Sequence, residues 1–189
     1  MSGTTKISDV SLIRDIARGE KWAMHAFYTR HNLRVFRFAL RILHDDALAE
    51  DTVSEVFLNV WRKAGNFSGR SQVSTWLLAI TRHKAHEIAR RRLAEPLNDE
   101  EYEAVADTSD DPETSMCKKQ NGSILFACLS KLSAHHREII DLVYYHEKSI
   151  DEAAAILCVP RNTVKTRMFY ARQRLAHLLS GKVVLTART

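Results

Sequence analysis

Apolar residues recur along most of the chain at the three- and four-residue spacing of amphipathic helices, and long strand-like alternation is absent. In the first half, this spacing predicts a helix whose inward face is Ala49, Val53, Val56, Phe57, Val60, Trp61 and Ala64. Gly65 follows where such a helix would stop. A second helix is expected from about Ser74 to Arg92, with inward residues Trp76, Leu77, Ile80 and Ile88. Residues 9–18 and 22–43 are also apolar at helical spacing.

The second half is patterned in the same way. Ser149 and Glu152 have the spacing of a capping box, which predicts a short helix over about 150–157. Pro160 separates it from a longer helix, whose predicted core stripe is Val164, Met168, Ala171, Leu175, Leu178 and Leu179. Upstream, another stripe is expected from Ile139, Ile140, Val143 and Tyr144. The whole chain is therefore predicted to be all-α.

Charge divides the chain into two basic blocks and one acidic stretch. Residues 95–115 contain nine acidic residues, no basic residue and two of the three prolines, which is typical of a solvated, flexible linker. Residues 1–94 and 116–189 each have a net charge of +7. We therefore predict a domain at 1–94, an acidic linker at 95–115 and a domain at 116–189. Two basic domains favour a polyanionic partner.

Several classes of protein are disfavoured by the sequence. The chain has no run of 18 apolar residues and no apolar signal core at its start, so we expect neither a membrane span nor secretion. Cys117, Cys128 and Cys158 are odd in number and widely spaced, which suits the reducing cytoplasm. The histidines and cysteines lack metal-ligand spacing. We predict no metal, no cofactor and no catalytic residues.

The stretch from Ser149 to Leu179 has the parts of a helix-turn-helix: a short capped helix, a tight turn and a basic helix. With Val164, Met168 and Ala171 facing inward, the helical period turns polar, basic and aromatic residues outward. These residues are Asn162, Lys165, Thr166, Phe169, Tyr170 and Gln173, with Arg161 and Arg172 at the flanks. Such a face offers hydrogen-bonding groups to base edges and cations to phosphates. An ordinary surface helix is the alternative.

The stretch from Asp51 to Arg92 carries two further patterns. The outer face of its first helix mixes acidic, polar and apolar residues, namely Asp51, Ser54, Glu55, Leu58 and Arg62. This mixture suits a surface for a protein partner, and a solvated face is the alternative. The loop and helix that follow bring together Phe67, Arg82, His83, Lys84 and Arg90–Arg92. Aromatic rings interleaved with cations are typical of single-stranded DNA binding.

At this point the sequence resembles the bacterial RNA polymerase sigma factors of the extracytoplasmic function (ECF) type. Residues 49–61 resemble sigma region 2.2, and residues 67–83 resemble regions 2.3 and 2.4. Residues 132–145 and 149–175 resemble regions 4.1 and 4.2. The chain has Ser54 where the family usually has Gln, His83 where Asn is common, and Glu87 where Asp is common. The last two departures bear on the base preference at the −10 element.

The resemblance implies three sets of site residues. Core polymerase would be bound by Asp51, Ser54, Glu55, Leu58 and Trp61. The unwound −10 strand would be held by Asn66, Phe67, Arg82, His83, Lys84, Arg90 and Arg91. The −35 duplex would be read by Arg161, Asn162, Thr163, Lys165, Thr166, Phe169 and Tyr170. The resemblance also implies an anti-sigma factor as regulator.

The sequence leaves two alternative functions open. A helix-turn-helix regulator that acts without polymerase would explain the basic second half, but it leaves the 49–92 pattern unexplained. A sigma mimic that titrates an anti-sigma factor is the other alternative. Mimics of that kind carry a receiver domain, for which 189 residues leave no room.

Overall fold

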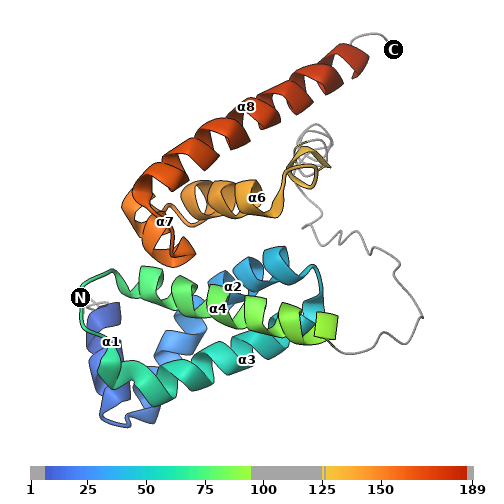
Figure 1. The fold of residues 1–189 in the computed structure, drawn as a ribbon. Coiled ribbons are helices and arrows are strands. Elements are labelled where there is room, and N and C mark those ends of the chain that lie inside the picture. Colours follow the sequence, from blue (N-terminus) through green and yellow to red (C-terminus); the bar gives the residue numbers. More distant parts are fainter. Residues whose placement is uncertain (1–6, 95–124, 126, 187–189) are drawn as a thin grey trace, which may run out of the picture.

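A computed structural model of the chain describes residues 7–94, 125 and 127–186. These residues form helices and their connections, and no strand occurs among them. The all-α prediction is confirmed (Figure 1). The predicted acidic linker at 95–115 lies outside the described residues.

The N-terminal domain is a bundle of the helices α1 (Asp9–Ala17), α2 (Lys21–Leu43), α3 (Asp46–Lys63) and α4 (Val73–Ala94). Ser8 and Asp45 cap α1 and α3, each with a side-chain oxygen that accepts a backbone N–H from the first turn. The core is built from the predicted stripe of α3 and from apolar residues of the other helices, including Leu12, Ile16, Phe27, Val35 and Leu77.

A short connection joins α3 to α4. It begins with the 3₁₀ turn η1 (Ala64–Asn66), so α3 ends at Lys63, two residues before Gly65, where the sequence predicted a stop. Gly69 has a φ of 71°, a left-handed conformation that glycine adopts without a Cβ clash. The connection therefore turns sharply and returns the chain along α3 as α4.

The C-terminal domain consists of α6 (Ala134–Ile140), the π-helical turn η2 (Asp141–Tyr145), α7 (Ile150–Leu157) and α8 (Arg161–Thr186). The predicted capping box is present, with Ser149 and Glu152 each accepting the other's backbone N–H. One prediction was wrong: Tyr144 is exposed, whereas Ile139 and Ile140 are buried. A π-helical turn winds more widely than an α-helix, so the inward stripe does not continue through it.

The two domains pack directly against each other. Figure 1 shows α6 and α7 lying over α2 and α4 of the N-terminal bundle. Phe38 of α2 and Leu78 of α4 are buried in one apolar cluster with residues of the C-terminal domain, among them Ile139, Leu142 and Ile156. This placement has no counterpart in the sequence prediction, which joined the domains only through a linker.

Candidate nucleic-acid interface

The helix-turn-helix is formed by α7 and α8. Its turn contains Cys158, whose φ of 53° is left-handed, at the position after α7 where glycine is common. Val164, Met168 and Ala171 are buried, as predicted, and they seat α8 on α6 and α7. The helical period therefore fixes which face of α8 remains open to solvent.

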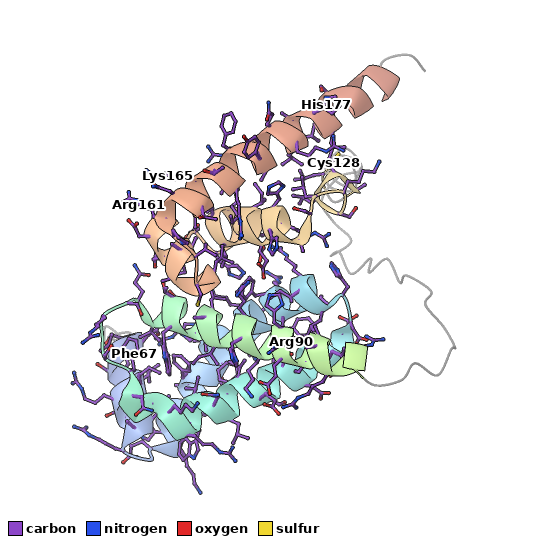
Figure 2. All side chains as sticks on the ribbon, in the orientation of Figure 1. Phe67, Arg90, Cys128, Arg161, Lys165 and His177 are labelled. Atoms are coloured by element: carbon purple, nitrogen blue, oxygen red, sulfur yellow. The ribbon has the colours of Figure 1, made fainter. Side chains whose placement is uncertain are left out.

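The open face of α8 holds the residues predicted to read duplex DNA. Arg161, Asn162, Lys165, Thr166, Phe169 and Tyr170 are exposed, and Thr163 is half-buried. Phe169 is 63% exposed and meets Tyr170 edge-to-face at 5.5 Å between ring centroids. Arg161 forms an ion pair with Asp151 at 3.2 Å. Figure 2 shows Arg161 and Lys165 together at the N-terminal end of α8.

The outer face of α3 is also open. Asp51, Ser54, Glu55 and Leu58 are exposed, whereas Trp61 is half-buried and packs against the core of the bundle. Glu55 forms an ion pair at 2.9 Å with Lys84 of α4. Hydrogen bonds from Lys84 to Glu55 and Glu87 raise the pKa of Lys84. One residue assigned to polymerase binding thus contacts one assigned to DNA binding.

A shallow hollow of about 370 Å³ lies between α3 and α4. Three residues of the predicted −10 set line it, namely Asn66, His83 and Lys84. Its other walls are Asn59, Lys63, Trp76, Ala79 and Ile80. Phe67, also in the predicted set, contacts Trp76 with the ring centroids 5.2 Å apart and the ring planes tilted by 53°. The aromatic ring of Trp76 and the cationic groups of Lys63 and Lys84 in its walls suit a nucleotide.

Sequence reasoning missed some of these lining residues. It treated Trp76 mainly as a core residue, and the structure places it half-buried, against the core and lining the hollow. Asn59 and Lys63 were not singled out. Their spacing of four residues on α3 places them on one helix face, which is a signal that could have been used.

The remaining −10 residues are spread along α4. Figure 2 shows Phe67 and Arg90 near opposite ends of this helix. Arg90 and Arg91 are exposed, and Arg91 pairs with Glu87. Arg82 does not line the hollow, because its guanidinium instead contacts Glu138 of α6. The structure therefore places Asn66, His83 and Lys84 at the hollow with Phe67 beside them, and it places Arg82, Arg90 and Arg91 elsewhere on α4.

Among the residues that the structure describes, no three His, Cys, Asp or Glu side chains cluster as a metal site would require. Cys128 is buried and Cys158 is exposed, and both are free thiols. No helix in the described ranges is long and apolar enough to cross a membrane.

Comparison with known proteins identifies both halves of the chain. Residues 27–94 match the family Sigma-70 region 2, and residues 128–177 match Sigma-70, region 4. The ECF RNA polymerase sigma factor SigK of Mycobacterium ulcerans is 30% identical over 174 residues, which cover 90% of this chain and 93% of that protein. The chain belongs to the ECF family of RNA polymerase sigma factors. Sigma factors are transcription initiation factors and not enzymes.

Further relatives agree with this assignment. The RNA polymerase sigma-H factor of Pseudomonas aeruginosa is 27% identical over 180 residues, covering 90% of this chain and 93% of that protein. The solved structure of the sigma factor RpoE of Bartonella quintana, bound to the anti-sigma factor NepR, aligns with a TM-score of 0.67 and 26% identity. That alignment covers 81% of this chain and 94% of the other. CnrH, solved with the cytosolic domain of CnrY, has the same fold at a TM-score of 0.67, 22% identity and coverage of 92% and 97%.

Proposed function

We propose that this sigma factor divides the work of promoter recognition among the three surfaces described above. The observation that carries the proposal is that the exposed faces of α3 and α8 and the hollow beside α4 belong to one chain of the ECF family. The proposed domains are residues 1–94 and 116–189, joined by residues 95–115. The site of action is the cytoplasm.

The outer face of α3 is the proposed site for core RNA polymerase. Leu58 is 46% exposed and lies between acidic and polar neighbours. The surface that core polymerase would cover therefore has an apolar centre and a charged and polar rim. Asp51, Ser54 and Glu55 supply that rim. Trp61 holds α3 against the bundle, because it is half-buried and packs against the bundle core.

The hollow between α3 and α4 is the proposed site for an unpaired base of the −10 element. Stacking on an aromatic ring compensates for the unstacking of a base from the duplex, and Trp76 lines the hollow. His83 and Lys84 line the same hollow and would lie near the base or its phosphate. Arg90 and Arg91 are exposed further along α4, where they would follow the strand.

The open face of α8 is the proposed reader of the −35 duplex. An α-helix enters the major groove, where amides, hydroxyls and guanidinium groups distinguish base pairs. Phe169 would contact thymine methyl groups, and Arg161 and Lys165 would meet phosphates. Each domain alone would bind weakly, and polymerase would join the two contacts on one promoter.

An anti-sigma factor is the proposed regulator. The structure of a relative at 26% identity is described as a complex of a sigma factor with its anti-sigma factor. A protein that covers the surfaces of both domains at once would block polymerase and DNA together.

The test is run-off transcription from a promoter library with core polymerase and the purified chain. Leu58→Asp is expected to reduce transcripts and core binding by about tenfold or more, because a charge would enter the centre of the proposed interface. The matched control is Leu33→Asp, which changes a leucine of α2 that is 54% exposed. Equal loss in both variants would contradict the assignment of the α3 face.

The same assay separates the alternative functions. Transcripts that depend on the chain and share two spaced elements support the sigma function. A stable complex with core polymerase that yields no transcripts would favour a sigma mimic. Tight duplex binding with no core binding would favour a regulator that acts without polymerase.

A further inference from the structure

The contact between the two domains contains a buried carboxylate that is held by cationic groups. Glu138 of α6 is only 9% exposed and accepts hydrogen bonds at 3.2 and 3.4 Å from the guanidinium of Arg82. His86 Nε2 lies 2.9 Å from Glu138 Oε1. Burial raises the pKa of Glu138, but the hydrogen bond from His86 and the charge of Arg82 outweigh it and lower that pKa. The carboxylate is therefore ionised in this contact.

The contact follows one face of α4. Thr75, Leu78, Arg82 and His86 recur at intervals of three and four residues, which places them in one stripe. Thr75 donates a hydrogen bond of 2.5 Å to Glu152 at the start of α7, Leu78 is fully buried in the shared cluster, and Arg82 and His86 hold Glu138. The C-terminal domain thus covers three turns of the helix that is proposed to hold the −10 strand.

Further charged and polar contacts join the C-terminal domain to α2 and to the start of α4. Asp141, which is also buried, pairs with Arg41 of α2, and Arg41 stacks on Tyr145 at 3.6 Å from the ring centroid. Arg137 of α6 donates a hydrogen bond of 2.7 Å to His44 Nε2, just after α2. Lys148 also donates one of 2.6 Å to Ser74 at the start of α4. Hydrogen bonds and ion pairs therefore hold the two domains together at several separate points.

We propose that this packing is an autoinhibited state, in which Glu138 occupies the Arg82 guanidinium in place of a DNA phosphate. This inference rests on the proposed function, since it takes Arg82 as a residue of the −10 strand site. A guanidinium presents the same fork of N–H donors to a carboxylate and to a phosphate. Glu138 occupies the Nε–Nη2 edge of Arg82, and with α6 packed over it the Arg82 side chain is only 22% exposed, so a phosphate of the strand cannot take the same edge in this state. Closure and strand binding therefore exclude each other.

The exclusion has a thermodynamic consequence. DNA that binds only the open form has an apparent affinity reduced by the fraction of chains that are open. Weakening the closed contact from the side of α6 should therefore tighten DNA binding, although no DNA-binding residue is changed. A sigma factor closed in this way would bind stray nucleic acid poorly until polymerase separates its domains.

The test uses the full chain and a fluorescein-labelled single-stranded DNA 20-mer of random sequence, with fluorescence anisotropy as the readout. Glu138→Gln keeps the side-chain size and removes the charge. We expect roughly tenfold tighter binding, which corresponds to the loss of one charge-assisted pair from the closed state. Small-angle X-ray scattering of the same variant should show a larger radius of gyration than the unaltered chain. A thermal melt confirms that each variant is folded.

The matched control is Glu147→Gln, which removes one negative charge from an exposed position of the same domain. It should bind DNA like the unaltered chain and remain compact. His86→Gln weakens the hold on Glu138 from the other side and should also tighten DNA binding, the opposite of what loss of a DNA-facing donor would do. This second variant keeps the test decisive if Glu138→Gln folds poorly.

Two results would overturn the inference. One is an equal gain in affinity for Glu138→Gln and Glu147→Gln, which would reflect net charge alone. The other is an unchanged radius of gyration for both Glu138→Gln and His86→Gln. Failure of the proposed function is a separate result, because it would appear as absent transcripts with core polymerase while the scattering and anisotropy still showed opening.

Discussion

Phe169 combines features that rarely occur together at a residue on a soluble surface. Its ring is 63% exposed on a helix that is otherwise polar on that side, and it meets the ring of Tyr170. Exposing such a ring costs solvation free energy, and the cost is recovered when the ring is covered by a partner. The groove of duplex DNA is the partner proposed for this face.

Phe169→Ala should therefore weaken binding of the isolated chain to its −35 duplex by roughly tenfold, within the range for a good base contact. The free energy of unfolding should change little, because the ring is mostly in solvent. Electrophoretic mobility shift and urea titration measure the two quantities. Leu33→Ala, which removes an exposed apolar side chain from α2, outside the surfaces proposed to bind DNA, serves as control. A large loss of stability in Phe169→Ala would instead assign the ring a structural role.

Glu152 shows how one residue can serve both its element and the contact between domains. It completes the capping box of α7, and it also accepts a hydrogen bond from Thr75 and pairs with Lys148 at 3.3 Å. Burial raises the pKa of Glu152, but these hydrogen bonds and the charge of Lys148 prevail and lower it to about 2. The sequence predicted the cap, and only the packing of α7 on α4 revealed the second contact.

At the scale of the element, the turn between α7 and α8 contains a residue with a strained backbone conformation, which lowers the stability of the fold. Cys158 takes a left-handed conformation with a φ of 53°, in which its Cβ meets the backbone. The thiol is exposed, and its Sγ donates to the carbonyl of Ala155 at 3.7 Å, a weak contact. The turn is therefore possible without glycine, but it is not optimal.

Cys158→Gly should raise the free energy of unfolding by about 0.5–1 kcal/mol, since glycine adopts this conformation without the steric penalty. Urea denaturation followed by circular dichroism gives the value. Ala155→Gly, at an exposed interior position of α7, should lower stability by a similar amount. If both substitutions destabilise the chain, the strain at Cys158 is negligible.

At the scale of the whole molecule, His146 lies in the contact between the domains. It is buried, and its ring meets Phe38 of α2 edge-to-face at 5.1 Å. Burial lowers the pKa of His146 to about 4, and the nearby charges of Arg34, Arg41 and Lys148 add to that effect. Asp141 approaches Nε2 to 3.4 Å and would favour the charged ring, but Arg41 holds that carboxylate and burial dominates.

Stability should therefore fall as the pH is lowered from about 6.5 towards 4. In this window the unfolded chain takes up a proton on His146 while the folded chain does not, so the loss reaches about 2 kcal/mol at pH 5. Urea titrations at pH 7 and pH 5 measure it. His146→Gln should reduce the difference between these two values, whereas His135→Gln, on the surface of α6, should leave it unchanged. Parallel curves for His146→Gln and the unaltered chain would contradict this assignment.

The sequence by itself determined the helical elements and, for α3 and the first turns of α8, the faces that are buried. Buried positions on α3 and α8, the cap at Ser149 and the exposed stripe around Leu58 and Phe169 follow from the helical period, which is a local property of the chain. The same period also indicated the helix-turn-helix, whereas the family was indicated by the resemblance of residue motifs in both halves of the chain.

Only the tertiary structure decided which faces meet. On α4, Leu77 is buried as predicted, but Trp76, Ile80 and Ile88 are only half-buried, and Leu78 is fully buried. Helix α4 has two covered faces, one against its own bundle and one against the C-terminal domain, and a single amphipathic stripe cannot describe both. The sequence predicts that Arg82 is a DNA-binding cation, yet its guanidinium is hydrogen-bonded to Glu138, 56 residues away in the sequence. Contacts at that separation arise from the packing of whole domains, which local periodicity does not encode.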